Sequence, residues 1–167
     1  MKAIINGKII LKDRIVCGQN IVFNEKVADF CEKNKGGLSL WFTVDDLNHL
    51  KRGGRLSATA ALVGGLLGIK PILHVDDQGK LTPVSKIRGR RQSLERLIET
   101  FQSDYTGSGG DTVFISHGDC LEDAEFVANG IRRNSTVKRV EISTIGPVVG
   151  SHSGPGTVAL FFFGKQR

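Results

Sequence analysis

Cysteine, methionine, tryptophan and tyrosine are all scarce in this chain: its 167 residues hold three cysteines and one each of the other three. The cysteines are odd in number and never in CxxC spacing, which disfavours a disulfide framework and a zinc site. No apolar run approaches the roughly 18 residues that a membrane-spanning helix needs. The opening Met1–Asn6 lacks the long apolar core of a signal peptide. These absences predict a soluble, cytoplasmic protein without a bound metal.

What is present is typical of a compact globular chain. Hydrophobic residues make up 40% of it and charged residues 24%, a balance that excludes disordered and fibrous classes. Apolar segments alternate with amphipathic ones, so the sequence predicts a layered α/β fold. We expect strands at 38–44, 71–75, 80–87, 112–116, 137–143 and 157–163, after four short ones within 3–23. We expect helices at 25–33, 46–51 (capped by Asp45), 58–67, 92–105 and 121–132.

Basic charge is concentrated in one stretch. The formal net charge is +6, and between residues 80 and 96 six basic residues accompany a single acid. Three of them precede or open the predicted helix 92–105, where the helix dipole disfavours cations by roughly 0.3–1 kcal/mol each: Arg88, Arg90 and Arg91. Two interpretations stay open, a solvated basic face and a surface for a partner's acidic or phosphate groups. Nucleic acid is the weaker option, because no aromatic residue interleaves the cluster.

Two glycine-rich segments could hold an anion. LKRGGRLS (50–57) places glycines before a predicted helix, where backbone N–H groups can approach an anion and Arg55 offers a forked donor. IGPVVGSHSGPG (145–156) sets three polar residues on a restricted backbone that suits a carboxylate or phosphate: Ser151, His152 and Ser153. Nucleophilic catalysis is disfavoured because the GxSxG pattern is absent and no acid adjoins His152. The alternatives are an ordinary corner between helices and a tight strand-to-helix turn.

A third polar segment, SHGDC (116–120), follows a predicted buried strand. Ligands of α/β proteins commonly bind at that end of a strand. His117 and Cys120 are nevertheless more typical of a local hydrogen-bond network and of a core. His49 and His74 have no partners at metal-ligand spacing, which disfavours a metal site.

In chain order, five motifs resemble those of the DegV family of bacterial fatty-acid-binding proteins. They are FTVDDL (42–47) followed by LKRGGRLS (50–57), GGLLGIKPIL (64–73), KIRGRR (86–91), ISHGD (115–119) and IGPVVGSHSGPG (145–156). The similarity covers residues 28–167 and corresponds to the C-terminal domain of such proteins. It implies an α/β domain with a mixed β-sheet that binds a long-chain fatty acid, uses no cofactor and is not itself an enzyme.

The resemblance also implies roles for particular residues. In this family the acyl chain lies in an apolar tunnel between two domains, and its carboxylate is presented to a kinase subunit for phosphorylation. By motif, His152 would lie near the carboxylate, flanked by Ser151 and Ser153 and assisted by Arg55. The face that docks the kinase would hold the basic cluster: Arg88, Arg90 and Arg91.

The first 27 residues depart from that family. MKAIINGKII (1–10) resembles the first strands of an amidohydrolase such as an acetylglucosamine-phosphate deacetylase, but no HxH metal pair follows, which excludes deacetylase activity. We expect a short β-rich segment at 1–27 and a DegV-like domain at 28–167, without the family's N-terminal domain that forms half of the tunnel. A second function therefore stays open: a non-catalytic interaction or dimerisation domain, with the half-tunnel collapsed or covered by the N-terminal strands or another copy.

Overall fold

The computed structural model describes residues 2–10, 15–23, 29, 32–54, 68–107 and 112–165. The backbone forms two compact units, Met1–Lys35 and Gly36–Arg167. The domain boundary predicted after residue 27 stays a prediction. The predicted helix at 25–33 lies largely outside the described residues, and the one at 58–67 lies almost wholly outside them.

In the first unit two strands pair with each other. β1 (Lys2–Ile10) runs antiparallel to β2 (Ile15–Phe23), with Lys2 opposite Phe23 and Ile10 opposite Ile15. The sequence predicted four shorter strands in this region, broken at glycines. The register shifts on either side of Gly7, so β1 continues through the glycine that was expected to end it.

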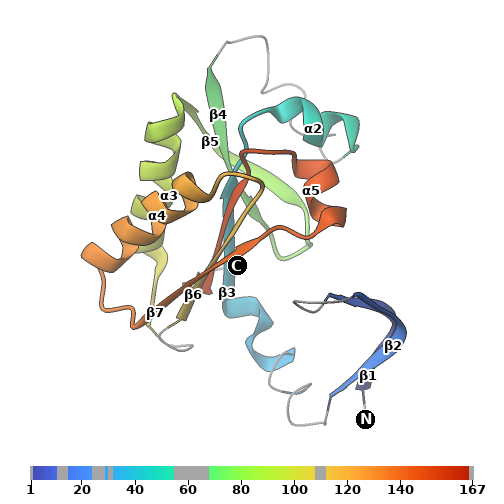
Figure 1. Cartoon of the computed structure of the whole chain (residues 1–167). Helices are drawn as coiled ribbons and strands as arrows, with labels where there is room; N and C mark the ends of the chain where they lie inside the picture. The colour runs from blue at the N-terminus through green and yellow to red at the C-terminus, as the bar shows by residue number, and fades with distance from the viewer. Residues whose placement is uncertain are drawn as a thin grey trace. The chain divides into compact units, whose positions relative to one another are not determined.

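The second unit is built on a six-stranded sheet with the order β5-β4-β3-β8-β6-β7 (Figure 1). A 3-10 turn, Lys35–Gly37, leads into it. The strands are β3 (Leu38–Thr43), β4 (Ile69–Val75), β5 (Leu81–Arg88), β6 (Thr112–His117), β7 (Arg139–Thr144) and β8 (Val158–Phe163). Of the six, β6 and β7 run parallel and the other neighbours run antiparallel. The predicted α/β class with a mixed sheet is confirmed.

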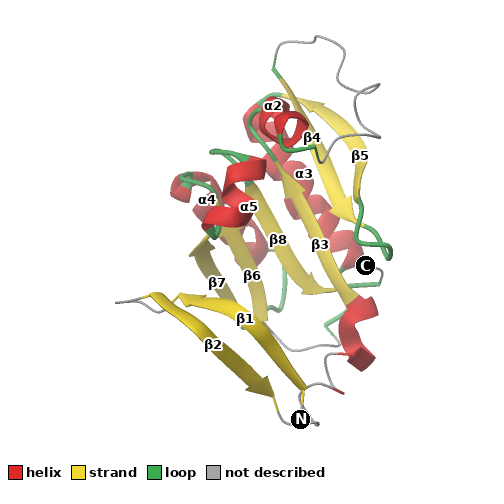
Figure 2. Cartoon of the chain, turned by 90° about the vertical axis from the view of Figure 1, so that its right-hand side faces the viewer, coloured by secondary structure: helices red, strands yellow, loops and turns green. Residues whose placement is uncertain are grey.

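Helices cover the two faces of this sheet unequally (Figure 1). The long α3 (Arg90–Asp104) and α4 (Leu121–Arg133) lie on one face, and α4 is the crossover that the parallel pair β6–β7 requires. The short α2 (Leu47–Arg52) and α5 (Pro147–Ser153) lie beside each other on the opposite face (Figure 2). The predicted helices at 92–105 and 121–132 agree with α3 and α4.

The structure differs from the sequence-based description at two places near the short helices. Asp46, not Asp45, caps α2, because its side chain accepts a hydrogen bond from the Asn48 N–H at 2.9 Å. Asp45 lies one residue too early and instead pairs with Lys70 at 2.5 Å. The second difference is α5, which forms where a turn was one interpretation: Pro147 opens it, and Gly154 at φ +80° ends it.

The core lies between the sheet and helices α3 and α4. The predicted apolar stripe of α3 is buried against it: Leu94, Leu97, Ile98 and Phe101. Alternate residues of β8 face this stripe: Val158, Leu160 and Phe162. The Phe101 ring centroid lies 4.8 Å from that of Tyr105 and 5.0 Å from that of Phe162, so an aromatic cluster closes one part of the core.

We predict that Phe101→Ala lowers the free energy of unfolding by about 3–5 kcal/mol, because it removes a fully buried ring and leaves a cavity. Phe114→Ala is the matched control, since Phe114 is 53% exposed on β6, and we expect a loss below about 1 kcal/mol. Urea unfolding followed by tryptophan fluorescence measures both. Equal losses in the two variants would contradict this assignment of the core.

Candidate functional site

The sheet face that carries α2 and α5 also holds a groove of about 560 Å³. Strands β3, β8 and β6 contribute its floor, while α5 and the turn between β4 and β5 border it. The floor is mainly apolar: Leu40, Phe42, Ala159 and Phe161. A cavity of this size and character lies in the range that small-molecule sites occupy.

The apolar surface continues onto the rim of the groove. Val148 and Val149 of α5 line it and are 75% and 61% exposed. Phe114 precedes the groove-lining Ser116 by two residues on β6, so it extends the same face of the sheet. Contiguous exposed apolar residues of this kind mark surfaces that take a ligand or a partner.

Polar groups gather at the last turn of α5. His152 and Ser153 both line the groove. The Ser153 hydroxyl is buried and has no hydrogen-bond partner within the described part of the chain. Ser151 instead faces solvent and donates its hydroxyl to the Val148 carbonyl at 2.8 Å. Of the three predicted ligands on this segment, the structure thus brings two to the groove.

Backbone contacts between three loops hold α5 in place. The Gly118 N–H donates to the Thr157 carbonyl at 2.8 Å, and the Gly156 N–H donates to the Gly118 carbonyl at 2.7 Å. A Cβ on Gly118 would lie 2.8 Å from the Gly154 carbonyl oxygen, and a Cβ on Gly156 would collide with Asp45. Three of the five sequence motifs therefore meet beside the groove, through glycines that allow this close approach.

The turn between β4 and β5 supplies another part of the groove wall. Asp76 accepts hydrogen bonds from the N–H groups of Gln78 and Lys80, both at 2.9 Å, and from the Thr82 hydroxyl at 3.2 Å. The bond from Lys80 is the main cause that lowers the pKa of Asp76 below its ordinary value of 3.8. Val75 and Leu81 flank this turn and line the groove, so the Asp76 carboxylate fixes their spacing.

The basic cluster at the start of α3 has mostly internal partners. Arg90 donates from Nε at 2.9 Å and from Nη2 at 2.7 Å to one carboxylate oxygen of Asp123 on α4. The Arg91 guanidinium lies 3.6 Å from the ring centroid of Phe126 and also pairs with Glu95. Arg88 is exposed, and its side chain makes no hydrogen bond or ion pair to any residue that the structure describes. Arg55, the other predicted ligand, lies outside the described residues.

His117 forms the local hydrogen-bond network that the sequence favoured, and Cys120, which was expected in the core, is partly buried against it. The Cys120 N–H donates to His117 Nδ1 at 3.1 Å, and the Cys120 thiol donates to the Thr157 carbonyl at 3.4 Å. Burial raises the pKa of this thiol, so it stays protonated at neutral pH. Ser116 lies in the SHGDC segment that the sequence indicated and lines the groove from β6, whereas sequence reasoning missed Thr157 and Thr144, which line it beside the ends of β8 and β7. Their position at the ends of strands was the only available signal.

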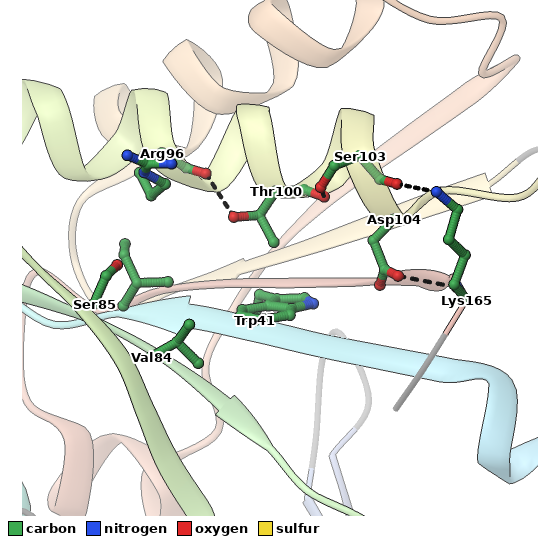
Figure 3. A pocket seen from close by; sticks show the side chains of 9 residues that line it. Trp41, Val84, Ser85, Arg96, Thr100, Ser103, Asp104 and Lys165 are labelled. Carbon is green, nitrogen blue, oxygen red and sulfur yellow. Dashed lines mark hydrogen bonds between the residues drawn. The ribbon is translucent and has the colours of Figure 1, made fainter.

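A second cavity, of about 530 Å³, lies between α3 and the opposite face of the sheet (Figure 3). Its polar lining is largely engaged within the chain. Asp104 accepts bonds from the Ser39 hydroxyl at 2.8 Å and the Lys165 N–H at 3.1 Å, while Lys165 Nζ donates to the Ser103 carbonyl at 2.5 Å. Trp41 Nε1 in this cavity is buried without a partner among the described residues, as the Ser153 hydroxyl is in the groove. The groove is the stronger candidate for a ligand site because its floor and rim are apolar and its polar groups gather at the end of α5.

The described residues provide neither a metal centre nor a membrane-spanning helix. They contain no group of three or more His, Cys, Asp or Glu side chains that could hold a metal ion. None of the helices they form is long and apolar enough to cross a membrane.

Comparison with known proteins decides the family. A family model described as an uncharacterised protein of the DegV family matches residues 9–165. The chain belongs to the DegV family. The resemblance based on five motifs is therefore confirmed. The DegV match begins at residue 9, so it overlaps only the last two residues of MKAIINGKII (1–10), and the comparisons give the amidohydrolase resemblance no support.

Individual DegV proteins are similar over most of this chain. A DegV domain-containing protein of Clostridium perfringens is 47% identical over 143 residues, which is 86% of this chain and 49% of that protein. The crystal structure of a fatty acid binding DegV family protein from Streptococcus agalactiae has a TM-score of 0.72 and 32% identity, covering 83% of this chain and 49% of that one. A DegV lipid binding protein from Thermotoga maritima has a TM-score of 0.65 and 32% identity, covering 85% and 48%. The chain thus spans about half the length of the curated relatives it matches.

We predict that Asp76→Asn flattens the fall in stability at acid pH. The lowered pKa means that the Asp76 carboxylate stabilises the fold fully above its ordinary pKa of 3.8, and that this contribution is lost as pH falls through the lowered value. Urea unfolding from about pH 6 to pH 2 should show lower stability of the variant at pH 6 and convergence with wild type at the acid end. Asp77→Asn, the exposed neighbour, is the control. Parallel curves for wild type and Asp76→Asn would contradict the prediction.

Proposed function

We propose that this chain is a fatty-acid-binding module, with the acyl chain in the apolar groove and its carboxylate at the end of α5. The observation that carries the proposal is the position of His152 and Ser153 at the edge of a groove whose floor is mainly apolar. The names of the relatives from Streptococcus agalactiae and Thermotoga maritima, fatty acid binding and lipid binding, support the same ligand class.

The groove offers the acyl chain a favourable environment. Transfer of each methylene group from water contributes about 0.8 kcal/mol where the group is fully covered. Phe42 and Ala159 of the floor are already buried, whereas Val148 and Val149 on the rim are exposed and would lose water contact when a ligand binds. Apolar surface on both sides of the ligand would therefore contribute to affinity.

The polar end of the groove suits a carboxylate. The buried Ser153 hydroxyl has a free donor, and a carboxylate oxygen would satisfy it and remove the cost of an unpaired buried group. The His152 ring borders the same end and supplies a second donor. Ser151 would first have to give up its bond to Val148, and Arg55 remains in the proposal on its motif alone.

The arrangement favours binding over catalysis. A histidine that activates a serine normally takes its orientation from a carboxylate. In the described part of the chain no carboxylate hydrogen-bonds to His152. We therefore propose a carrier that presents its ligand to another protein and does not transform it.

The partner in this proposal is a kinase subunit, as the family resemblance implies. Within the basic cluster, Arg90 and Arg91 are engaged with Asp123 and Phe126. Arg88 is exposed and available, so it is the arginine of the cluster that we propose to meet an acidic group of the partner.

Native mass spectrometry of freshly purified protein, followed by extraction of the released molecule, tests the proposed ligand. We expect an adduct of fatty-acid mass. His152→Ala and Ser153→Ala should each lower affinity for oleate about tenfold or more, because each removes a hydrogen bond to a charged group. Ser103→Ala is the control for the loss of a serine hydroxyl from the last turn of a helix, since Ser103 lies outside the groove and its hydroxyl donates to the Thr100 carbonyl.

The other outcomes separate the remaining explanations. Dimers without an adduct, and without affinity for oleate, would favour the second candidate, in which another copy covers the exposed valines of α5. If wild type carries an adduct of fatty-acid mass but oleate affinity is unchanged in both His152→Ala and Ser153→Ala, the proposed ligand would stand. The assigned carboxylate site would be overturned.

We predict that Arg88→Glu weakens capture of the kinase subunit and leaves oleate affinity unchanged. The reversed charge replaces attraction to an acidic partner group by repulsion, and rim charges act mainly on association. A pull-down with a purified fatty acid kinase subunit is the measurement, and Lys86→Glu, on the same side of β5 two residues away, tests whether charge alone is sufficient. Undiminished capture by Arg88→Glu would exclude this docking residue.

A further inference from the structure

Two adjacent glycines end helix α2, and they are glycines for different reasons. Gly54 adopts φ +68°, a conformation that other residues rarely enter, and no atom of the described residues lies within 4 Å of the position of a Cβ. Gly53 has φ −74° and ψ 0°, which any residue can adopt. The backbone therefore explains Gly54 but gives no reason for a glycine at position 53.

The side chain of His152 on α5 explains why position 53 is a glycine. A Cβ on Gly53 would lie 2.5 Å from His152 Nδ1 and 3.3 Å from His152 Cγ. Both distances are below ordinary van der Waals contact, so the His152 ring packs directly on the Cα of Gly53. The added Cβ would also lie 3.3 Å from the His49 carbonyl oxygen, a milder contact than the one with the ring. A methyl group there would therefore act mainly by pushing the ring away.

A second contact of the same kind joins α2 and α5, with the histidine on α2 and the glycine at the end of α5. The ring of His49 on α2 packs on Gly154, the residue that ends α5, and a Cβ on Gly154 would lie 2.5 Å from His49 Cγ. His49 Nδ1 also accepts a hydrogen bond from Arg52 at 3.2 Å, which holds this ring. Each helix thus ends in a glycine on which a histidine of the other helix rests.

We propose that Gly53 is a positioning residue for the ligand site: it holds the His152 ring at the edge of the groove, where the ring meets the anionic group of the ligand. The inference rests on the proposed function, and it adds a residue that lines no part of the groove. It also gives the GG pair of the LKRGGRLS motif a role that does not depend on anion binding by its backbone.

Gly53→Ala tests the proposal with two readouts, using the full chain. The first is the long-range ¹H–¹⁵N spectrum of the histidine rings, in which the His152 signals are identified by their absence in His152→Ala. The second is oleate affinity, measured for Gly53→Ala, His152→Ala and the double variant. Gly150→Ala is the control, because it also adds a methyl group near the end of α5, but its Cβ would meet only Ile145 Cγ2, at 3.8 Å.

We expect the His152 ring signals to move in Gly53→Ala and to stay in place in Gly150→Ala. Oleate affinity should fall about tenfold in Gly53→Ala, and Gly53→Ala should cause no further loss in the His152→Ala background, since it acts through that ring. Unmoved ring signals would overturn the proposal, and so would an equal loss with and without His152. If wild type binds no oleate, the proposed function fails, while the ring signals still decide whether Gly53 holds His152.

Discussion

The groove depends on backbone segments that approach each other more closely than side chains would allow. Gly118 lies against the Gly154 carbonyl, Gly156 lies against Asp45, and His49 packs on Gly154. The segments concerned are distant in sequence, and each contributes a glycine or packs on one. Because close-packed protein has no room for an added methyl group at such points, these contacts determine where α5 stands and which of its side chains face the groove.

The two faces of the sheet differ in role: one forms the core that stabilises the fold, and the other carries the groove. One face is sealed by α3 and α4, with residues such as Phe101 and Leu160 fully buried. On the other face the short helices α2 and α5 leave apolar floor residues bordered by exposed valines. Because the core on the α3–α4 face already stabilises the sheet, the strands can expose apolar side chains on the groove face without loss of the fold. Alternation along β3 and β8 produces this division, since successive side chains point to opposite faces.

Much of this architecture could be predicted from local pattern. The 3.6-residue spacing of α3, the hairpin β4–β5 and the apolar strand β3 all have signals within a few residues. Helix α5 could not be predicted in this way, because Gly, Pro and Ser in IGPVVGSHSGPG favour turns. Contacts with distant loops stabilise the helix there. The family motifs indicated the site region, and His152 and Ser153 do reach the groove.

The charges show the limit of local reasoning most clearly. Arginines at the start of α3 oppose the helix dipole, which suggested an external partner. Asp123 and Phe126 on α4 provide much of the explanation, yet they are more than thirty residues away in sequence. Likewise nothing in the sequence shows that Ser151 turns toward Val148 while Ser153 turns inward. Side-chain direction on a short helix follows from tertiary packing, which one sequence does not display.

The position of β8 has a consequence for the order in which the second unit can assemble. This strand lies between β3 and β6, and its pairing with β3 joins Leu38 to Phe163. Pairings over such a separation carry a high loop-closure cost and slow folding. During synthesis, β3, β4 and β5 emerge long before the strand that links them to β6 and β7. Until β8 has been synthesised, the edge of β3 that pairs with it stays unpaired. A chaperone that covers this edge would be expected to raise the yield of folded protein.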